Sequence, residues 1–285
     1  MMNVFSAAPF LVAAEDSFLV VYKPPRMHSA PLKRSAVDAP GLAPGNERVS
    51  GERIPGERTL LDWCARSFPE ITAVRGRNPW EGGLLHRLDH ETSGLTLIAR
   101  TQAAFDALAA AQKAGSFAKE YAALSAGAVK TLPSMPAPPF PAARLFEAGN
   151  GLPPLSIESA FRPYGPGRKA VRPVPLNFYG ENPEKRAVKE VVFDRGRPYR
   201  TEILETKAEE GEEKLIDFRV RIRRGFRHQI RSHLAWLGYP LINDALYGGA
   251  SRPEYPGLAL LAEAISFPDP ISGTIREYRL GQGPG

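Results

Sequence analysis

The sequence predicts a single domain of mixed α/β or α+β class, in which strands are interspersed with a few helices. Three observations support this class: short apolar or alternating runs typical of strands, three helix-like stretches with recognisable ends, and a sequence without internal repeats or coiled-coil heptads. The chain has 285 residues, which is enough for one large domain with its own core.

The predicted strands begin near the N-terminus. Phe10–Ala14 and Phe18–Lys23 are apolar runs separated by a polar turn, and Gly94–Arg100 is a third, mainly apolar run. Leu215–Ile222 alternates between apolar and polar residues, which is typical of a strand with one buried face. Further strands are predicted at Lys119–Ser125, Arg200–Glu205, Leu258–Phe267 and Thr274–Leu280.

Three helices are predicted, and each has a signal at one or both ends. Thr59 can cap the first helix and Thr101 the second, because a threonine hydroxyl accepts hydrogen bonds from unpaired backbone N–H groups. Gly115 ends the second helix and Gly238 the third. The predicted ranges are Thr59–Phe68, Thr101–Ala114 and His228–Leu237.

Two stretches, at about 30–58 and 131–190, are rich in proline and show little periodicity. They predict loop-rich insertions, the second with short strands rather than a packed domain of its own. We therefore expect one domain over residues 1–280 and a flexible tail at 281–285.

The formal net charge of +6 favours a polyanionic partner. Cys64 is the only cysteine, so it is expected to be a core residue in a reducing, cytoplasmic setting. The N-terminus lacks the pattern of a signal peptide, and no stretch approaches about 20 continuous apolar residues, the length needed to cross a membrane.

The most informative stretch is Leu85–Arg100, LHRLDHETSGLTLIAR. It places one acid, Asp89, among His86, Arg87 and His90, just before a tight turn and a predicted strand. A carboxylate beside an arginine on such a turn is well placed to act as a catalytic acid. The alternative is that Asp89 only caps the turn, which is a common role of aspartate.

Two later segments carry further candidates. Tyr121, in Lys119-Glu120-Tyr121, opens a predicted strand, where its flat ring could lie beneath a nucleobase or pack in the core. The segment RGFRHQIRSH, residues 224–233, lies at a predicted strand–helix junction and contains Arg231.

These segments resemble, in the same order, the motifs of the RluA-type pseudouridine synthases. The string HRLDHETSG is similar to the segment that carries the family's acid, and HQIR matches part of a later motif. Weaker similarities extend the resemblance from about Val12 to Leu280; they include Leu19–Pro24, Leu237–Pro240 and Asn243–Gly248, whose Asp244 we expect to be structural.

The resemblance implies a pseudouridine synthase fold: a mixed, mostly antiparallel sheet with flanking helices and a central basic cleft. It also implies an enzyme that isomerises a specific uridine in structured RNA, ribosomal RNA being favoured and transfer RNA possible. This reaction needs one ionised carboxylate, as nucleophile or base, and no cofactor. The small N-terminal RNA-binding module found in some relatives is not expected.

The resemblance assigns three catalytic residues. Asp89 is the acid, Tyr121 stacks on the flipped base, and Arg231 pairs with the acid and keeps it ionised. Arg87 matches the arginine that fills the gap left by the flipped base. Phe226 and Arg227 depart from the family pattern, which puts RNA contacts at the rim in question.

Other residues are candidates for RNA contact. Phe161–Arg172 combines basic and aromatic residues on a Gly/Pro turn, which suits either an RNA contact or a solvated loop. His228 and Gln229 could be structural or contact RNA. The candidate RNA-binding set is Arg87, His86, Lys119, His228, Gln229, Arg168 and Lys169.

Two alternatives to an RNA isomerase remain. A metal hydrolase could use His86, His90, His228 and His233, but the order HExxH is missing and arginines compete nearby, so no metal site is expected. A non-catalytic RNA-binding protein of the same fold would be favoured if the acid, arginine or tyrosine were missing, and all three are present. We also expect a monomer that does not bind membranes.

Overall fold

The computed structural model describes residues 6–31, 59–127, 135–147, 154–176, 191–193, 196–208 and 215–281. The chain divides into two compact units: Met1–Ala111 with Pro268–Gly285, and Gln112–Phe267. The predicted loop at 30–58 and the tail at 281–285 lie outside the described residues, apart from 30, 31 and 281.

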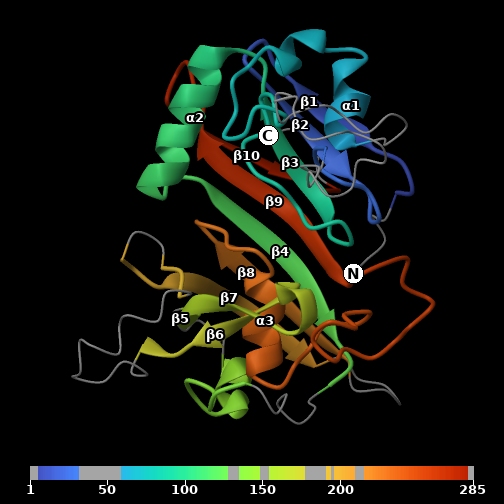
Figure 1. Ribbon diagram of the computed structural model, residues 1–285, viewed down its shortest axis with the longest axis vertical. Helices are drawn as coiled ribbons and strands as arrows, with labels where there is room; N and C mark the ends of the chain where they lie inside the picture. The colour runs from blue at the N-terminus through green and yellow to red at the C-terminus, as the bar shows by residue number, and fades with distance from the viewer. Residues whose placement is uncertain are drawn as a thin grey trace, which may run out of the picture. The chain divides into compact units, whose positions relative to one another are not determined.

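The first unit contains an antiparallel sheet of β1 (Phe10–Ala14), β2 (Phe18–Lys23) and β3 (Ser93–Ala99), with β2 in the middle (Figure 1). Every residue of β2 and β3 is buried, which explains why both read as nearly continuous apolar runs. The register pairs Lys23 with Gly94, so the polar end of β2 lies beside the start of β3.

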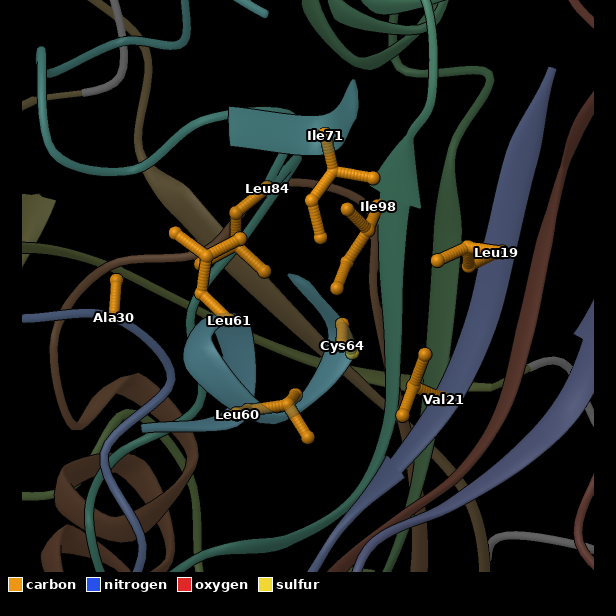
Figure 2. Packing of buried hydrophobic residues seen from close by; sticks show 9 residues of the cluster. All are labelled: Leu19, Val21, Ala30, Leu60, Leu61, Cys64, Ile71, Leu84 and Ile98. Atoms are coloured by element: carbon orange, nitrogen blue, oxygen red, sulfur yellow. The ribbon is translucent and has the colours of Figure 1, made fainter. Parts of the chain in front are cut away.

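The core of the first unit includes this sheet and the helix α1 (Leu60–Ala65) (Figure 2). Thr59 caps α1 as predicted, because its hydroxyl accepts a hydrogen bond from the N–H of Asp62. The helix is shorter than predicted because Pro69 disfavours helical geometry at Phe68, whose φ and ψ are −132° and 66°. The buried cluster consists of Leu19, Val21, Ala30, Leu60, Leu61, Cys64, Ile71, Leu84 and Ile98.

The boundary between the two units falls inside regular elements rather than in linkers. It cuts the helix α2 (Gln102–Ala114) and the strand β9 (Leu260–Pro268). The hydroxyl of Thr101 accepts a backbone N–H at 3.2 Å at the start of α2. Gly115 adopts a φ of 84°, which ends the helix where predicted.

The second unit is built on an antiparallel sheet with the strand order β9–β4–β8–β7–β5–β6 (Figure 1). β8 alternates between buried and half-buried residues, as its sequence pattern predicted. The strands other than β9 are β4 (Ala118–Ser125), β5 (Leu155–Tyr164), β6 (Ala170–Val174), β7 (Tyr199–Ala208) and β8 (Ile216–Ile222).

The helix α3 (Gln229–Trp236) packs on this sheet, and all of its residues are buried. Its Ser232 hydroxyl donates to the carbonyl of Val171 on β6 at 3.1 Å. The helix begins one residue later than predicted because His228 has a left-handed φ of 54°. The remaining elements are η2 (Pro69–Thr72), η3 (Ala142–Glu147), η4 (Pro166–Arg168) and, in the first unit, β10 (Ile275–Arg279).

The predicted fold class is confirmed, but the stretch at 131–190 contributes more to the sheet than its sequence indicated. β5 and β6 lie within it, and residues such as Ile157 and Phe161 are fully buried. The prediction of loops and short strands was based on the prolines of this stretch. β7 pairs with β5 only as far as Ser159, so Pro163 interrupts none of those bonds, and Pro173 lies on the last strand of the order.

Within the described ranges, no helix is long and apolar enough to cross a membrane. The same residues contain no group of three or more His, Cys, Asp or Glu side chains that could hold a metal ion.

Candidate active site and RNA interface

Asp89 lies on a tight turn directly before β3. The N–H of Thr92 donates to the carbonyl of Asp89 at 3.1 Å, which closes a four-residue turn, and β3 starts at Ser93. The Asp89 residue is partly exposed, whereas Thr92 and Ser93 are buried. The predicted arrangement, an acid on a turn that leads into a buried strand, is therefore present.

The segment before the acid is held against β3 by its backbone. The N–H of Ala99 donates to the carbonyl of Gly83 at 2.7 Å, and the N–H of Leu85 donates to the carbonyl of Leu97 at 3.0 Å. A Cβ at Gly83 would lie 1.9 Å from the carbonyl oxygen of Ala99, so only glycine fits. Further along, the Ser29 hydroxyl bonds both the N–H and the carbonyl of Leu88 at 3.1 Å. These contacts fix the chain next to Asp89.

Lys23 is a buried cation beside the acid turn that the sequence analysis did not assign to the site. Its residue is 0% exposed, and its ammonium donates three hydrogen bonds of 2.8 to 3.2 Å to backbone carbonyls, one of them that of His90. Burial lowers the pKa of Lys23 to about 7, against the opposing effect of the negative charges of Asp89 and Glu91. A lysine at the end of an otherwise apolar buried strand was the available signal.

Arg87 and His86 differ in their exposure. The Arg87 side chain is 52% exposed and forms an ion pair at 3.0 Å with Glu81, whose side chain is buried. His86 is buried, and its Nε2 lies 3.4 Å from the carbonyl oxygen of Leu95. Arg87 is therefore accessible to a large ligand, whereas the burial of His86 favours a packing role.

Tyr121 lies on β4 in the second unit and is 5% exposed. β4 has a register shift between Glu120 and Tyr121 in its pairing with β9. Such irregularities often redirect a side chain next to a functional site. Lys119, two residues earlier, is also buried, and its ammonium stands 5.5 Å from the centre of the Phe117 ring.

Arg231 is clamped by an acid whose role towards it the sequence did not reveal. On α3, its Nε and Nη2 donate to the two carboxylate oxygens of Asp244 at 2.8 and 2.7 Å. Its guanidinium also stands 5.4 Å from the centre of the Tyr247 ring. Asp244 is fully buried at its side chain and lies in a turn, which agrees with the structural role expected for it. A bidentate pair of this kind fixes the orientation of the guanidinium.

The start of α3 is fixed by Gln229. Its amide Oε1 accepts the N–H of Phe226 at 3.0 Å, and its Nε2 donates to the carbonyl of Arg200 and the hydroxyl of Thr201. Gln229 is 2% exposed. Of the two roles that the sequence left open, these contacts favour the structural one. His228 remains half-buried, with Nδ1 at 3.3 Å from the Tyr247 hydroxyl.

His233 is the buried histidine of the second unit. Its ring nitrogens lie 2.9 Å from the Ser159 hydroxyl and 2.8 Å from the Thr201 hydroxyl. Burial lowers its pKa to about 3, so the ring is neutral near pH 7. Because two hydroxyl groups occupy both nitrogens, His233 is a structural residue of the core.

The two departures from the family pattern have visible contacts. Phe226 stacks on Phe161 of β5, with ring centres 5.0 Å apart and an angle of 9°. The Arg227 guanidinium donates to the carbonyl of Arg168, in the turn between β5 and β6, and to that of Ala170, the first residue of β6. Both residues therefore fasten the β5–β6 hairpin to the start of α3.

The fold, with Asp89 on a turn before β3 and Arg231 on the buried helix α3, is compatible with an RNA-modifying class of protein. Comparisons with known proteins define the family. Residues 17–236 match the model of the RNA pseudouridylate synthase family. The match covers more than half of the chain, so the chain belongs to this family.

Similar proteins carry related names. An uncharacterized RNA pseudouridine synthase of Chloroflexus aurantiacus is 29% identical over 223 residues, 77% of this chain and 55% of that protein. Ribosomal large subunit pseudouridine synthase D of Vibrio vulnificus is 25% identical over 281 residues, 94% of this chain and 65% of that protein. The chain thus spans less than two thirds of the length of these relatives.

Solved structures agree on the fold. Human RNA pseudouridylate synthase domain containing 1 superposes with a TM-score of 0.57 at 20% identity, covering 96% of this chain and 84% of that one. Human RNA pseudouridylate synthase domain containing 4 gives 0.51 at 13% identity, with coverages of 90% and 84%. At these identities the likeness concerns the fold alone.

Proposed function

We propose that this chain is an RNA pseudouridine synthase that uses Asp89 to isomerise a uridine in structured RNA. Its membership of the RNA pseudouridylate synthase family supports the reaction type, and the turn that presents Asp89 before β3 carries the assignment of the acid. The similarity to ribosomal large subunit pseudouridine synthase D favours ribosomal RNA over transfer RNA as the substrate. The expected setting is the cytoplasm, and the expected state is a monomer.

The proposed reaction conserves all atoms of the nucleotide. The bond between uracil N1 and ribose C1′ breaks, the base turns, and a bond forms between uracil C5 and C1′. The proton on C5 is lost and N1 gains a proton, so neither a redox partner nor an energy source is needed. Asp89 acts at the sugar, by attack on carbon or by removal of a ribose proton.

Two further residues complete the proposed chemistry. Arg231 supplies a fixed positive charge for the proposed chemistry, because Asp244 holds its guanidinium in place through two hydrogen bonds. Tyr121 lies beneath the flipped base as a stacking surface.

Residues around this centre would hold the RNA. Arg87 is exposed and suited to occupy the space left by the flipped base. His228, Arg168 and Lys169 are the other candidates for contact, being half-buried or exposed. The burial of His86, Lys119 and Gln229 favours roles in shaping the site rather than in contacting RNA.

Tritium release from ribosomal RNA labelled at uridine C5 tests the proposal, because the C5 proton leaves in the reaction. Asp89→Asn should fold normally and release no tritium, since the amide is neither a nucleophile nor a base. Glu91→Gln, which neutralises an acid two residues away, should retain activity and serves as the matched control. Full activity of Asp89→Asn would refute the assignment.

A further inference from the structure

Glu81 is a buried carboxylate that faces the exposed arginine of the acid motif. The Glu81 side chain is 5% exposed, whereas that of Arg87 is 52% exposed. The Arg87 Nη1 donates to the Glu81 Oε1 at 3.0 Å. The sequence analysis gave no role to Glu81, because this residue lies outside the motif.

The backbone around Glu81 is fixed by a compact turn. Its N–H donates to the carbonyl of Asn78 at 3.0 Å, and its carbonyl accepts the N–H of Leu84 at 3.1 Å. The next residue, Gly82, has a φ of 50°, and a Cβ there would lie 2.6 Å from the carbonyl oxygen of Ile71. The carboxylate is therefore presented from a support that has little freedom to move.

The backbone of Arg87 is fixed on both sides as well. Before it, the N–H of Leu85 donates to the carbonyl of Leu97 in β3 at 3.0 Å. After it, Leu88 is bonded through its N–H and its carbonyl to the Ser29 hydroxyl. An exposed arginine on a fixed backbone still samples several rotamers, and binding a ligand then costs side-chain entropy. The ion pair at the guanidinium restricts these rotamers before RNA binds.

The burial of Glu81 distinguishes this contact from an ordinary surface ion pair. Two exposed charges stabilise each other little, because water solvates both partners. A buried carboxylate has lost most of that solvation, so separating it from the guanidinium would be costly. The contact uses one of the five N–H donors of Arg87, and the exposed part of the guanidinium can still reach a ligand.

We propose that Glu81 is a positioning residue, which orients the Arg87 guanidinium for insertion into the RNA stack when the target uridine is extruded. This role rests on the proposed function, in which Arg87 occupies the space left by the flipped base. In this role Glu81 touches neither the RNA nor the reacting atoms. Its effect should appear in the rate of the reaction rather than in the affinity, because the oriented guanidinium is needed after the RNA has bound.

Single-turnover tritium release from ribosomal RNA labelled at uridine C5 tests this role with Glu81→Gln. Glutamine keeps the volume of the side chain and removes the charge that holds Arg87. The rate at saturating protein should fall about tenfold, because a small displacement of a positioned group slows a reaction. The dissociation constant for RNA should change by less than about twofold. The melting temperature should stay nearly unchanged, because a neutral side chain of the same size replaces a buried charge.

A double-mutant cycle separates positioning from a general structural role. In a protein that carries Arg87→Ala, the substitution Glu81→Gln should cause no further loss of rate, because the guanidinium that Glu81 orients is missing. Equal slowing by Glu81→Gln in both backgrounds would refute the proposal. Glu70→Gln is the matched control: it removes an acid that accepts a hydrogen bond of 2.7 Å from Arg100 in the same unit, and it should leave the rate unchanged.

NMR provides a measurement that does not depend on activity. The Nε–Hε signal of Arg87, assigned by its loss in Arg87→Ala, should report an ordered group in the RNA-free protein and a mobile group in Glu81→Gln, as measured by the heteronuclear NOE. A mobile Arg87 in the unsubstituted protein would overturn the proposal even when tritium release is observed. If Glu81 orders Arg87 but no tritium is released, the proposed reaction fails and the ordering of Arg87 stands.

Discussion

A substitution of the single residue Tyr121 can separate RNA binding from chemistry in the proposed reaction. Tyr121→Phe keeps the ring and removes the hydroxyl, so we expect the affinity for RNA to be largely preserved. If the hydroxyl assists removal of the C5 proton, turnover should fall by about 100-fold or more. Filter binding and single-turnover tritium release measure the two quantities.

Tyr121→Ala is the matched control, because it removes the ring as well. It should lose the stacking contribution, about 1–3 kcal/mol, in addition to turnover. Equal losses of affinity and turnover in Tyr121→Phe would contradict the division of roles.

The buried ammonium of Lys23 predicts a pH-dependent stability. Its pKa is about 7 in the folded protein and near 10.5 in the unfolded chain, so between these values the unfolded chain binds more protons and the contribution of Lys23 to stability rises with pH. The free energy of unfolding of Lys23→Met should therefore decrease relative to that of the original protein as the pH rises, by at most about 1.4 kcal/mol per pH unit. Urea unfolding at about pH 7, 8 and 9, values between the folded and the unfolded pKa of Lys23, measures the difference.

A difference that stays constant with pH would show that the Lys23 ammonium does not titrate as inferred. Since Lys23 donates to the carbonyl next to Asp89, loss of its hydrogen bonds should also loosen the acid turn. Hydrogen exchange of the amide of Thr92, which closes that turn, reports on this effect.

At the scale of elements, the acid segment is positioned by the close approach of Gly83 to Ala99 as well as by the side-chain hydrogen bonds of Ser29 and Lys23. Gly83→Ala would force a methyl group against the carbonyl of Ala99. This carbonyl cannot move without distorting the backbone of β3. We expect a loss of about 2 kcal/mol or more in the free energy of unfolding. Gly225→Ala is the control, because its Cβ would meet only ordinary contacts at 3.4 Å and beyond. Chemical denaturation of both variants compares them, and equal losses would contradict the prediction.

The elements that the sequence predicted well are those whose signals are local. β2 was predicted with its observed bounds because it is a continuous apolar run, and Thr59 was predicted as a cap because capping needs only neighbouring residues. β5 and β6 were underestimated because their prolines are tolerated only through their position in the sheet. That position depends on strand order, which a local pattern does not contain.

The site shows the same division. The turn that carries Asp89 is formed by consecutive residues, so the motif was sufficient to predict that turn. The clamp between Arg231 and Asp244 joins a helix to a later turn, and the burial of Lys23 depends on the pairing of β2 with β3. These are tertiary relations, and the spacing of the residues in the sequence does not indicate them.

At the scale of the whole molecule, the two compact units raise the question of whether they unfold separately. Independent domains are usually joined by exposed linkers, but here the boundary falls inside α2 and β9. Unfolding the first unit would unfold α2 from Gln102 to Ala111 and so break this shared helix. We therefore expect one cooperative transition, in agreement with the single domain that the sequence predicts.

Cys64 offers a specific probe of this cooperativity. It is the only cysteine, it is buried in the first unit, and burial raises its pKa to about 12, so its thiol should react slowly in the folded protein. Thiol labelling of Cys64 and hydrogen exchange of α3, in the second unit, should become rapid at the same urea concentration. Labelling that precedes the exchange of α3 would indicate two domains.

The clamp on Arg231 has a consequence for the timing of catalysis. Asp244 orients the Arg231 guanidinium through two hydrogen bonds, so the rotamer entropy of Arg231 is lost once, when the chain folds, and not again in each cycle of the proposed reaction. In the proposed reaction, the charge of Arg231 is therefore oriented before the nucleotide arrives, and the binding energy of the RNA remains available for extruding the base.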